Sequence, residues 1–488
     1  MNPHHDELFI GGRWVKPASD GRITVLGAST EDVLGSVPEG TEKDMDAAVA
    51  AARAAFDDPD GWSRWQPARR ADALSRLADA LERRSKDITR IVSAQNGMTI
   101  GLSEQVEGAL PGILLRYYAD QIRDDTGETV RDGMLGAPVH VRREPLGVVA
   151  AIVPWNAPQL LSATKYAPGL AAGCTFVLKP SPETVLDSVL FAEAVEEAGL
   201  PPGVVNVVPA GREAGAYLVS HPGVDKVAFT GSTAAGRQIA ATCGTLLRPV
   251  TLELGGKSAA VILDDVDLGT MMSEPFVQAT LLANGQACFA STRILAPRSR
   301  YDEVVDAVAS LVGGLTVGDP LDPATQVGPM ASARQRDRVE GYIQQGRTEG
   351  ARLVVGGSRP ALEKGLLRHA DGVRRRGQRP GHRPRGDLRP GAGRHPLHRR
   401  GRRRTHRERL GVRPRRHRVD ERRRARPARG TSHAHRDGRV EPLHGRPGGT
   451  VRRGQGEWAG PRVRAGSAAQ LPAGEVDLPV ILHGQDHR

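Results

Sequence analysis

The sequence predicts a doubly wound α/β fold followed by a second α/β region. Three observations support this. Short, nearly continuous apolar runs alternate with helical patterns between residues 146 and 241, as expected of strands buried in a parallel sheet and the helices between them. Glycine- or proline-bounded turns follow several of these runs, where such folds carry their ligand sites. The pattern resumes beyond residue 259 and stops near Gly365, within a chain of 488 residues that is long enough for more than one domain.

The N-terminal quarter is predicted to contain a β-hairpin and amphipathic helices. Residues 8–14 (LFIGGRW) alternate like a strand that enters a Gly-Gly turn. Residues 41–56 read as a helix that Thr41 can cap, with acidic residues in its first turn. Leucine and alanine at helical spacing predict further helices over residues 62–94 and 112–120.

Strands and helices then alternate. Residues 139–144 resemble an exposed strand, and the helix over residues 161–172 is expected to be interrupted at Pro168. The predicted order is strand 146–154, helix 161–172, strand 174–179, helix 185–198, strand 204–208, strand 227–230, a helix through Ala241, short apolar runs at 249–252 and 259–263, helix 301–311, helix 331–350 and strand 352–355.

The charge of the chain is divided unevenly. The formal net charge is +12, but residues 366–488 hold 33 Arg and no Lys against 11 acidic residues, which gives +22. Residues 1–365 hold 35 basic and 45 acidic residues, which gives −10. An acidic body therefore precedes a strongly basic tail, and the basic average does not indicate a polyanionic partner for the body.

Cysteine usage and the apolar runs predict a cytoplasmic protein. Cys174, Cys243 and Cys288 are too few and too scattered for a disulfide framework or a zinc site. The N-terminus lacks the basic flank and apolar run of a signal peptide. The longest apolar runs are about half a membrane span, so we expect neither a metal site nor a membrane partner.

Three bounded turns carry an amide, an acid and a thiol: Asn156 in PWNAP, Glu253 in LELGGKS and Cys288 in GQACFASTR. A thiolate can add to a carbonyl and form a hydrolysable thioester, a carboxylate can activate water, and an amide can donate to an oxyanion. Each residue also has a structural interpretation, as a small buried hydrophobe, a solvated loop acid and a turn-capping amide. Their joint occurrence favours a covalent site that acts on a carbonyl.

Together these motifs resemble those of the aldehyde dehydrogenase superfamily. The resemblance covers about residues 7–365 and includes FIGGRW, LKPSPET, FTGST and VGDPLDP, in the family's order and near its spacing. It implies oxidation of an aldehyde to a carboxylic acid with NAD, or NADP, through a thiohemiacetal and a thioester on Cys288. Asn156 and the Cys288 N–H would hold the oxyanion, and Glu253 would activate water. The aldehyde itself stays unidentified.

The resemblance also implies the cofactor residues. Lys179 would contact the adenosine ribose, and Gly231 with Ser232 would open the helix whose N-terminus faces the pyrophosphate. The other candidates from the same motifs are Trp155, Ser181, Glu183 and Gly255. No GxGxxG fingerprint follows the first buried strand, and none of these residues selects NAD over NADP.

The family fold implies a division into domains. Residues 1–125 and 146–253 would form a Rossmann-type NAD(P)-binding domain, residues 126–145 an oligomerisation β element, and residues 254–365 a truncated catalytic α/β domain. Dimers or tetramers are the family habit. The last part of the oligomerisation element would come from the C-terminus, and its loss here argues against oligomers of this chain.

The tail after Gly365 departs from the family. Residues 366–488 contain no Phe or Tyr, one Trp and no apolar period, so we expect a disordered segment. The family motif E-[EI]-x-FGP-V, whose glutamate helps to hold the nicotinamide ribose, is replaced by RGDLRPGAG over residues 385–393. An alternative function takes the tail as a non-specific nucleic-acid-binding extension. It contains neither interleaved aromatic residues nor a repeat that would support such a role.

A shift of one base restores the missing motif. Residues 385–392 can be encoded as CGA GGA GAT CTT CGG CCC GGT GCT, and removal of the first base gives Glu-Glu-Ile-Phe-Gly-Pro-Val. The same shift can turn residues 366–375 into Tyr-Tyr-Val-Thr-Pro-Thr-Val-Phe-Ala-Gly, which resembles the family strand that follows Lys-Gly. We therefore predict a frameshift close to Gly365 and little or no turnover by this chain.

Overall fold

The computed structural model describes residues 4–359, 365–366, 372–374 and 476–479. Residues 1–386 and 472–488 belong to one compact unit, and the second unit, residues 387–471, lies outside the described residues. Within the described ranges, no helix has the length and hydropathy that crossing a membrane would require.

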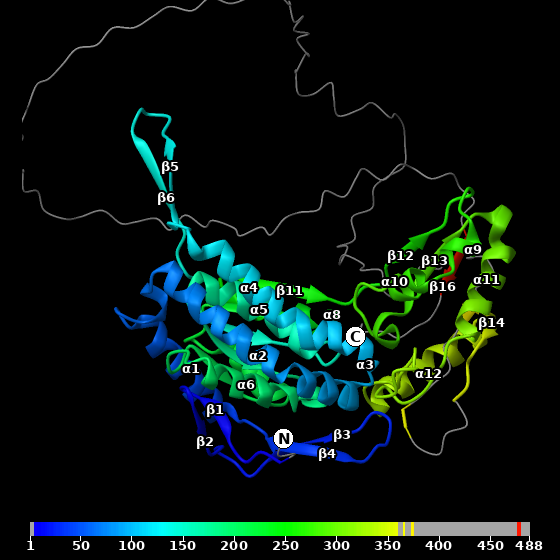
Figure 1. The fold of residues 1–488 in the computed structure, drawn as a ribbon, viewed down its shortest axis with the longest axis horizontal. Helices are drawn as coiled ribbons and strands as arrows, with labels where there is room; N and C mark the ends of the chain where they lie inside the picture. The colour runs from blue at the N-terminus through cyan, green and yellow to red at the C-terminus, as the bar shows by residue number, and fades with distance from the viewer. Residues whose placement is uncertain (1–3, 360–364, 367–371, 375–475, 480–488) are drawn as a thin grey trace, which may run out of the picture. The chain divides into compact units, whose positions relative to one another are not determined.

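Among the described residues, seven strands form the main sheet, in the order β11-β10-β7-β8-β9-β1-β2 (Figure 1). The strands from β11 to β9 are parallel, and β1 pairs antiparallel with β9 and β2. Their bounds are β1 Leu8–Ile10, β2 Arg13–Val15, β7 Val148–Ile152, β8 Thr175–Lys179, β9 Val205–Val207, β10 Lys226–Gly231 and β11 Val250–Leu254. The predicted doubly wound fold is confirmed. The chain runs from β7 outwards to β9 and then resumes on the other side of β7, so a topological switch point lies between β7 and β10.

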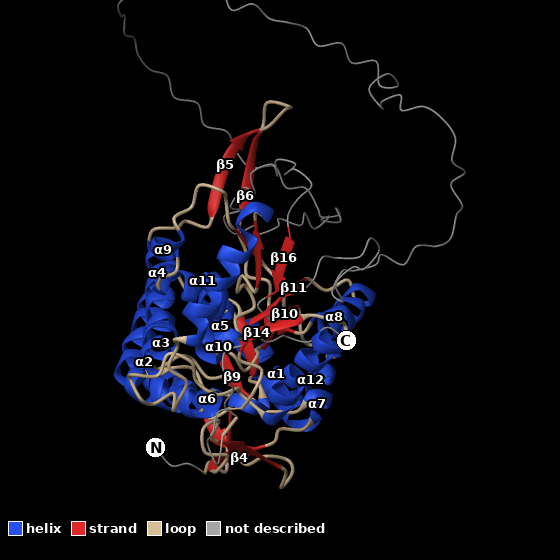
Figure 2. Cartoon of the chain, turned by 90° about the vertical axis from the view of Figure 1, so that its right-hand side faces the viewer, coloured by secondary structure: helices blue, strands red, loops and turns tan. Residues whose placement is uncertain are grey.

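Helices cover both faces of this sheet (Figure 2). Val149 and Ala151 of β7 pack with α2, α4, α5 and α6, whereas Val148 and Ala150 pack with α1, α7 and α8. Burial on both faces is the reason that these strands read as continuous apolar runs. The helices are α1 Glu42–Asp57, α2 Pro67–Asn96, α4 Leu110–Arg123, α5 Pro158–Ala172, α6 Asp187–Glu197, α7 Arg212–Ser220 and α8 Thr233–Thr245.

Helix α5 corrects one prediction, because it runs through Pro168 without interruption. Proline costs the helix one backbone hydrogen bond, but Ala163, Ala167 and Leu170 of the same helix are fully buried against the sheet. A Cβ on Gly169 would lie 2.3 Å from the ring of Phe176 in β8, so glycine allows the close approach. Packing on the sheet therefore outweighs the local helix-breaking signal.

The short elements near the N-terminus follow from turn chemistry and capping. The predicted Gly-Gly turn joins β1 to β2, with φ of 64° at Gly11 and 75° at Gly12, as a two-residue hairpin of the I′ type requires. A second hairpin was not predicted. It consists of β3 Arg22–Leu26 and β4 Val33–Pro38. The other short elements are η1 Trp62–Arg64, α3 Ile100–Ser103, η2 Glu104–Ala109, η3 Pro182–Thr184 and η4 Arg298–Arg300.

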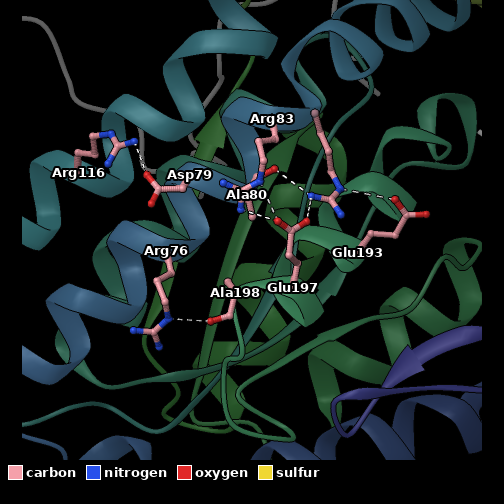
Figure 3. Close-up of polar contacts among 9 residues, drawn as sticks. Arg76, Asp79, Ala80, Arg83, Arg116, Glu193, Glu197 and Ala198 are labelled. Atoms are coloured by element: carbon pink, nitrogen blue, oxygen red, sulfur yellow. Dashed lines mark hydrogen bonds and ion pairs between the residues drawn. The ribbon is translucent and has the colours of Figure 1, made fainter.

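Ion pairs join α2 to α6 and α4 at the surface (Figure 3). Arg83 donates from Nε to Glu197 at 2.8 Å, and Arg84 pairs with the same carboxylate. Arg116 of α4 donates to Asp79 at 2.7 Å. The charge runs of α2 are therefore a solvated face, as expected from the sequence.

Residues 126–145 contain a hairpin of β5 Glu128–Asp132 and β6 Pro138–Arg142, which pair antiparallel (Figure 1). Its strands are largely exposed, and Val130, Met134 and Leu135 are exposed apolar side chains. The β structure expected here is present, and its role in oligomerisation stays a prediction.

A second α/β region with its own hydrophobic core follows. Strand β12 (Ala259–Val261) pairs parallel with β13 (Arg293–Ala296), and Ile294 packs with Val304 and Val308. The remaining elements are α9 Leu268–Met271, α10 Glu274–Gly285, α11 Tyr301–Gly313, α12 Ala333–Thr348 and β14 Arg352–Val355.

Two short strands lie within the tail that was expected to have no secondary structure. β15 (Gly372–Arg374) pairs with β14, and β16 (Val476–Pro479) pairs antiparallel with β13. The prediction is wrong at these residues, because the unpaired backbone groups of a sheet edge accept an extended segment of almost any sequence. The remainder of the predicted disordered tail, with the motif region 385–393, lies outside the described residues.

Candidate active site

The predicted site residues lie at one edge of the main sheet, because parallel strands share the edge at which they end. They are Trp155 and Asn156 after β7, Lys179 at the end of β8, Gly231 and Ser232 at the end of β10, and Glu253 and Gly255 at the end of β11. The switch point between β7 and β10 lies within this set. In open α/β sheets, ligands bind at such a point.

Asn156 contacts residues 282–288, which we call the Cys288 turn. Its side chain is 6% exposed, and Nδ2 donates to the carbonyl oxygen of Gln286 at 2.8 Å. Because a carbonyl only accepts, this contact assigns the amide nitrogen to the side that faces the Cys288 turn. The Oδ1 atom has no partner among the described residues. One N–H of the amide is thus used for orientation, and the second stays available to a ligand.

Cys288 is half-buried, and the turn after β11 runs beside it. A Cβ built on Gly256 would lie 3.7 Å from the Cys288 carbonyl oxygen. Burial raises the pKa of the Cys288 thiol, and the Glu253 carboxylate raises it further, against the opposing effect of the Cys288 and Phe289 N–H groups. The structure thus brings the predicted acid, amide and thiol together. The thiol is mostly protonated at neutral pH and needs a base to react.

The other two cysteines are packing residues. Cys174 and Cys243 are buried in the two cores that flank the main sheet. Burial raises the pKa of both thiols. All three cysteines of the chain are free.

Lys165 of α5 lies beside the predicted site residues and was not predicted. Its Nζ donates to Thr230 Oγ1 at 2.5 Å, and Thr230 is the register partner of Glu253. Burial lowers the pKa of the Lys165 ammonium to about 8, and the Glu253 carboxylate partly opposes this effect. The sequence signal was present, because this lysine is the one charged residue of the helix 158–172.

The candidate cofactor residues have partners of different kinds. Lys179 is buried and donates from Nζ to Pro180 O at 3.0 Å, and burial lowers the pKa of its ammonium to about 8. Ser181 donates to Glu183 at 2.6 Å, and Glu183 pairs with Arg334 of α12 at 2.8 Å. The negative charge of Glu183 is therefore paired with the positive charge of Arg334.

The turn between β10 and α8 is built tightly. Ser232 caps α8 by accepting from the N–H of Ala235 at 3.2 Å. A Cβ on Gly231 would lie 2.5 Å from the ring of Phe229, so a side chain at Gly231 would displace that ring. The N-terminus of α8 thus opens at the switch point, where its partial positive charge favours an anionic group.

Glu107 supports the start of α5, which follows Asn156 in the chain. This residue was also not predicted. It lies in η2, is fully buried, and accepts from the N–H of Gln159 in the first turn of α5 at 2.8 Å. Gln159 also donates to Asp187 at 2.6 Å. Burial raises the pKa of the Glu107 carboxyl to about 8, with a contribution from Asp187 and an opposing one from the N–H groups of Gln159 and Leu160. A glutamate among surface-like residues gives no sequence signal of such burial.

The substitution Glu107→Gln is expected to remove a pH dependence of stability. The unfolded carboxyl titrates near about pH 4.3, so between about pH 4.5 and about pH 8 the folded protein holds a proton that the unfolded chain lacks. This contribution to stability is largest at low pH and falls as the pH rises through that window. Glutamine keeps the acceptor and cannot ionise, so the variant should gain on the order of 2 kcal/mol at about pH 8.

Thermal melting of both proteins at about pH 5 and about pH 8 measures this difference. Equal melting temperatures of the two proteins at about pH 8 would contradict the assignment. The exposed Glu196→Gln change serves as a control that should alter neither value.

Comparison with known proteins gives a consistent result. The Aldehyde dehydrogenase family matches residues 14–369. The chain is 55% identical over 365 residues to geranial dehydrogenase from Castellaniella defragrans, covering 75% of this chain and 76% of that protein. It is 40% identical over 372 residues to phenylacetaldehyde dehydrogenase from Pseudomonas fluorescens, covering 75% and 73%.

Solved structures agree with the sequence relatives. Mycobacterium tuberculosis aldehyde dehydrogenase complexed with NAD+ has a TM-score of 0.73 at 45% identity, covering 76% of each chain. A mutant of aldehyde dehydrogenase C from Pseudomonas syringae, complexed with NAD+ and octanal, has a TM-score of 0.71 at 37% identity, covering 75% of this chain and 74% of that one. The chain belongs to the aldehyde dehydrogenase family.

Proposed function

We propose that this chain derives from an NAD-dependent enzyme that oxidises an apolar aldehyde to a carboxylic acid through a covalent intermediate on Cys288. The observation that supports this proposal best is that three groups lie together. The Asn156 amide nitrogen lies 2.8 Å from Gln286 O in the Cys288 turn, and the Glu253 carboxylate raises the pKa of the Cys288 thiol. These are the nucleophile, oxyanion donor and base that such chemistry requires.

In the first step the Cys288 sulfur adds to the aldehyde carbon, and its proton leaves to a base or to water. Burial and Glu253 keep the thiol protonated, so a base must accept this proton, and the Glu253 carboxylate is a candidate acceptor. The oxygen that becomes negative is held by the free N–H of Asn156 and by the Cys288 N–H, which would act as an oxyanion hole.

In the second half of the reaction the carbon on Cys288 is a thioester, and water must attack it. Glu253 takes a proton from that water and so makes it nucleophilic. The Glu253 carboxylate favours the ammonium form of Lys165, which donates to Thr230 beside Glu253 in the sheet. The acid then leaves, and the thiol is restored.

The cofactor fits the edge of the sheet at the switch point. NAD+, when bound there, supplies the hydride acceptor. The N-terminus of α8 behind Gly231 and Ser232 suits a pyrophosphate, and Lys179 suits a ribose. Trp155 and Gly255 would border it from the neighbouring strand ends, with Ser181 and Glu183 near the ribose. Solved relatives hold NAD+, which favours NAD over NADP.

An apolar aldehyde is supported by the surface beside the nucleophile and by the relatives. Phe289, which follows Cys288, is 66% exposed. An aromatic side chain that follows the nucleophile in sequence could contact an apolar substrate chain. Geranial and phenylacetaldehyde dehydrogenases are enzymes of apolar aldehydes by name.

The same enzyme would have two domains, a hairpin that joins subunits and a cytoplasmic location. The NAD(P)-binding domain would comprise residues 1–125 and 146–253, and the catalytic domain would begin at residue 254 and continue in the shifted frame after Gly365. The hairpin 126–145 would join subunits through its exposed apolar residues. Three free cysteines suit the reducing cytoplasm.

The substitution Glu253→Gln tests the assigned roles in two ways. In the chain as it stands, loss of the negative charge should move the pH midpoint of Cys288 alkylation downwards, because Glu253 raises the pKa of that thiol. In a chain read in the shifted frame, one burst of NADH should form, and steady turnover should then fall by about 10²- to 10⁴-fold. Alkylation is followed by mass spectrometry and NADH by absorbance.

The matched control is Glu183→Gln, since Glu183 is paired with Arg334. It should leave the Cys288 midpoint unchanged. An unchanged midpoint in Glu253→Gln would separate the acid from the thiol, and full steady turnover would remove Glu253 as the base.

A further inference from the structure

The backbone just before Cys288 adopts an unusual conformation. Helix α10 loses its helical geometry at Leu282, and the next three residues have positive φ: 51° at Ala283, 59° at Asn284 and 74° at Gly285. Residues other than glycine rarely adopt this left-handed region, and consecutive ones do so only when their surroundings hold them there. These residues form the first part of the Cys288 turn.

The Asn284 side chain makes the contacts that could hold this turn. Asn284 is buried, and its Nδ2 donates to Gly97 O at 2.7 Å and to Pro329 O at 3.1 Å. Its Oδ1 accepts from the N–H of Gly328 at 2.8 Å. One side chain thus uses both amide hydrogens and its oxygen on backbone groups of two distant segments.

Those two segments are in direct backbone contact. A Cβ on Gly97 would lie 2.2 Å from Pro329 O, and one on Gly328 would lie 2.1 Å from Gly97 O. Gln286 adds a second link, because its Oε1 accepts from the N–H of Ala331 at 3.1 Å. The Cys288 turn is therefore hydrogen-bonded to a junction between Gly97 and residues 328–331, where the backbones pack too closely for a side chain at Gly97 or Gly328.

The same junction also holds the backbone of Trp155 and Asn156, the turn that carries the proposed oxyanion donor. Asn96, the last residue of α2, donates from Nδ2 to Trp155 O at 3.3 Å and to Asn156 O at 3.2 Å. Consecutive residues 96 and 97 thus anchor the two turns that must meet. Asn156 closes the arrangement by its 2.8 Å bond to Gln286 O.

We propose that Asn284 is a positioning residue: it holds the Cys288 turn in its left-handed conformation against the C-terminus of α2, and so sets Cys288 opposite Asn156 and Glu253. The proposal rests on the proposed role of Cys288 as nucleophile. Without the three hydrogen bonds of the Asn284 side chain, the apolar residues FVQATLLA, which favour helix, would continue α10 through Ala283. The sulfur would then leave its half-buried place beside Glu253.

The test separates the effect of the Asn284 side-chain hydrogen bonds from the effect of backbone strain at positive φ. Glycine is the residue best suited to positive φ, so Asn284→Gly relieves strain while it deletes all three side-chain bonds. Ala283→Gly is the matched control, since it relieves strain at the adjacent position and removes no hydrogen bond. Iodoacetamide labels the full chain at a series of pH values, and mass spectrometry reports each cysteine. Cys174 and Cys243 serve as internal probes of global unfolding because both are buried.

We expect the alkylation midpoint of Cys288 to move to lower pH by about half a unit or more in Asn284→Gly, because burial and Glu253 raise the pKa of this thiol in its native place. The rate at neutral pH should rise about threefold or more. Cys174 and Cys243 should stay unlabelled, and Ala283→Gly should behave like the native chain.

A native midpoint and rate in Asn284→Gly would overturn the proposal, as would an equal shift in Ala283→Gly. If Asn284→Gly unfolds, as shown by labelling of all three cysteines, Asn284→Asp decides. Aspartate has the same shape and keeps the bond from Gly328, but it lacks the two donated bonds. Its negative charge would by itself raise the pKa of the Cys288 thiol, so a midpoint that still moves to lower pH would report displacement of the turn. A catalytic role of Cys288 fails independently, if Cys288→Ser retains aldehyde oxidation in the shifted-frame chain.

Discussion

Removing one base close to the codon for Gly365 is expected to raise aldehyde oxidation by at least about 10³-fold over the chain as it stands. Read in the shifted frame, the chain would regain Glu-Glu-Ile-Phe-Gly-Pro-Val and an apolar continuation of the second α/β region. In the present frame, the described residues that pair with β13 on that side are the four of β16. Displacement of catalytic groups by about 1 Å can already cost about 10²-fold in rate, and the loss of half a domain that the frameshift implies would cost more.

The measurement is NADH formation with NAD+ and an apolar aldehyde, at equal concentrations of the two chains. A second gene serves as control: it carries the same base removal and a compensating insertion a few codons later, so that most of the present tail is kept. That control should be as inactive as the original. Equal and high turnover of the original chain would refute the frameshift as a cause of inactivity.

In the shifted-frame chain, Cys288→Ser is expected to lower turnover by about 10³-fold or more. Serine places a hydroxyl where the thiol stands, and a hydroxyl is a far weaker nucleophile at neutral pH that forms a less reactive ester. The change should leave NAD+ affinity intact, because the candidate cofactor residues lie at the ends of β8 and β10 rather than in the Cys288 turn.

Cys243→Ala is the matched control, since Cys243 is buried in α8, away from the Cys288 turn. It should keep most of the turnover. Calorimetric titration with NAD+ checks that the serine variant still binds the cofactor. Retained turnover in Cys288→Ser would refute covalent catalysis at this position, and lost affinity would indicate a folding defect instead.

The parts of the molecule that sequence could predict are those with local causes. The apolar runs of β7 and β8 follow from burial on both faces of a sheet, and the Gly11-Gly12 turn follows from the freedom of glycine at positive φ. The three chemical residues were found because each lies in a distinctive short motif. Strand ends of a parallel sheet then had to bring them to one edge.

The parts that sequence could not predict depend on distant partners. Pro168 stays helical because α5 packs on β8, and Glu107 is buried because η2 packs against α5. Asn284 adopts a left-handed conformation because Gly97 and Pro329 offer carbonyl oxygens to it. The partners of Glu107 and Asn284 lie far outside the window that a periodicity or a motif covers, and the packing of α5 on β8 is not visible in the sequence of the helix itself.

The outer edge of β13 has a consequence for the fate of the chain. Its ladder with β16 joins backbone to backbone, from Arg293 opposite Pro479 to Ala296 opposite Val476, and such a ladder has little preference for side chains. The attached strand competes with strands of other copies only through its effective concentration, which falls as the connecting chain lengthens. Residues 297–475 separate the two strands, so a rise in protein concentration shifts this edge from self-pairing towards pairing between copies.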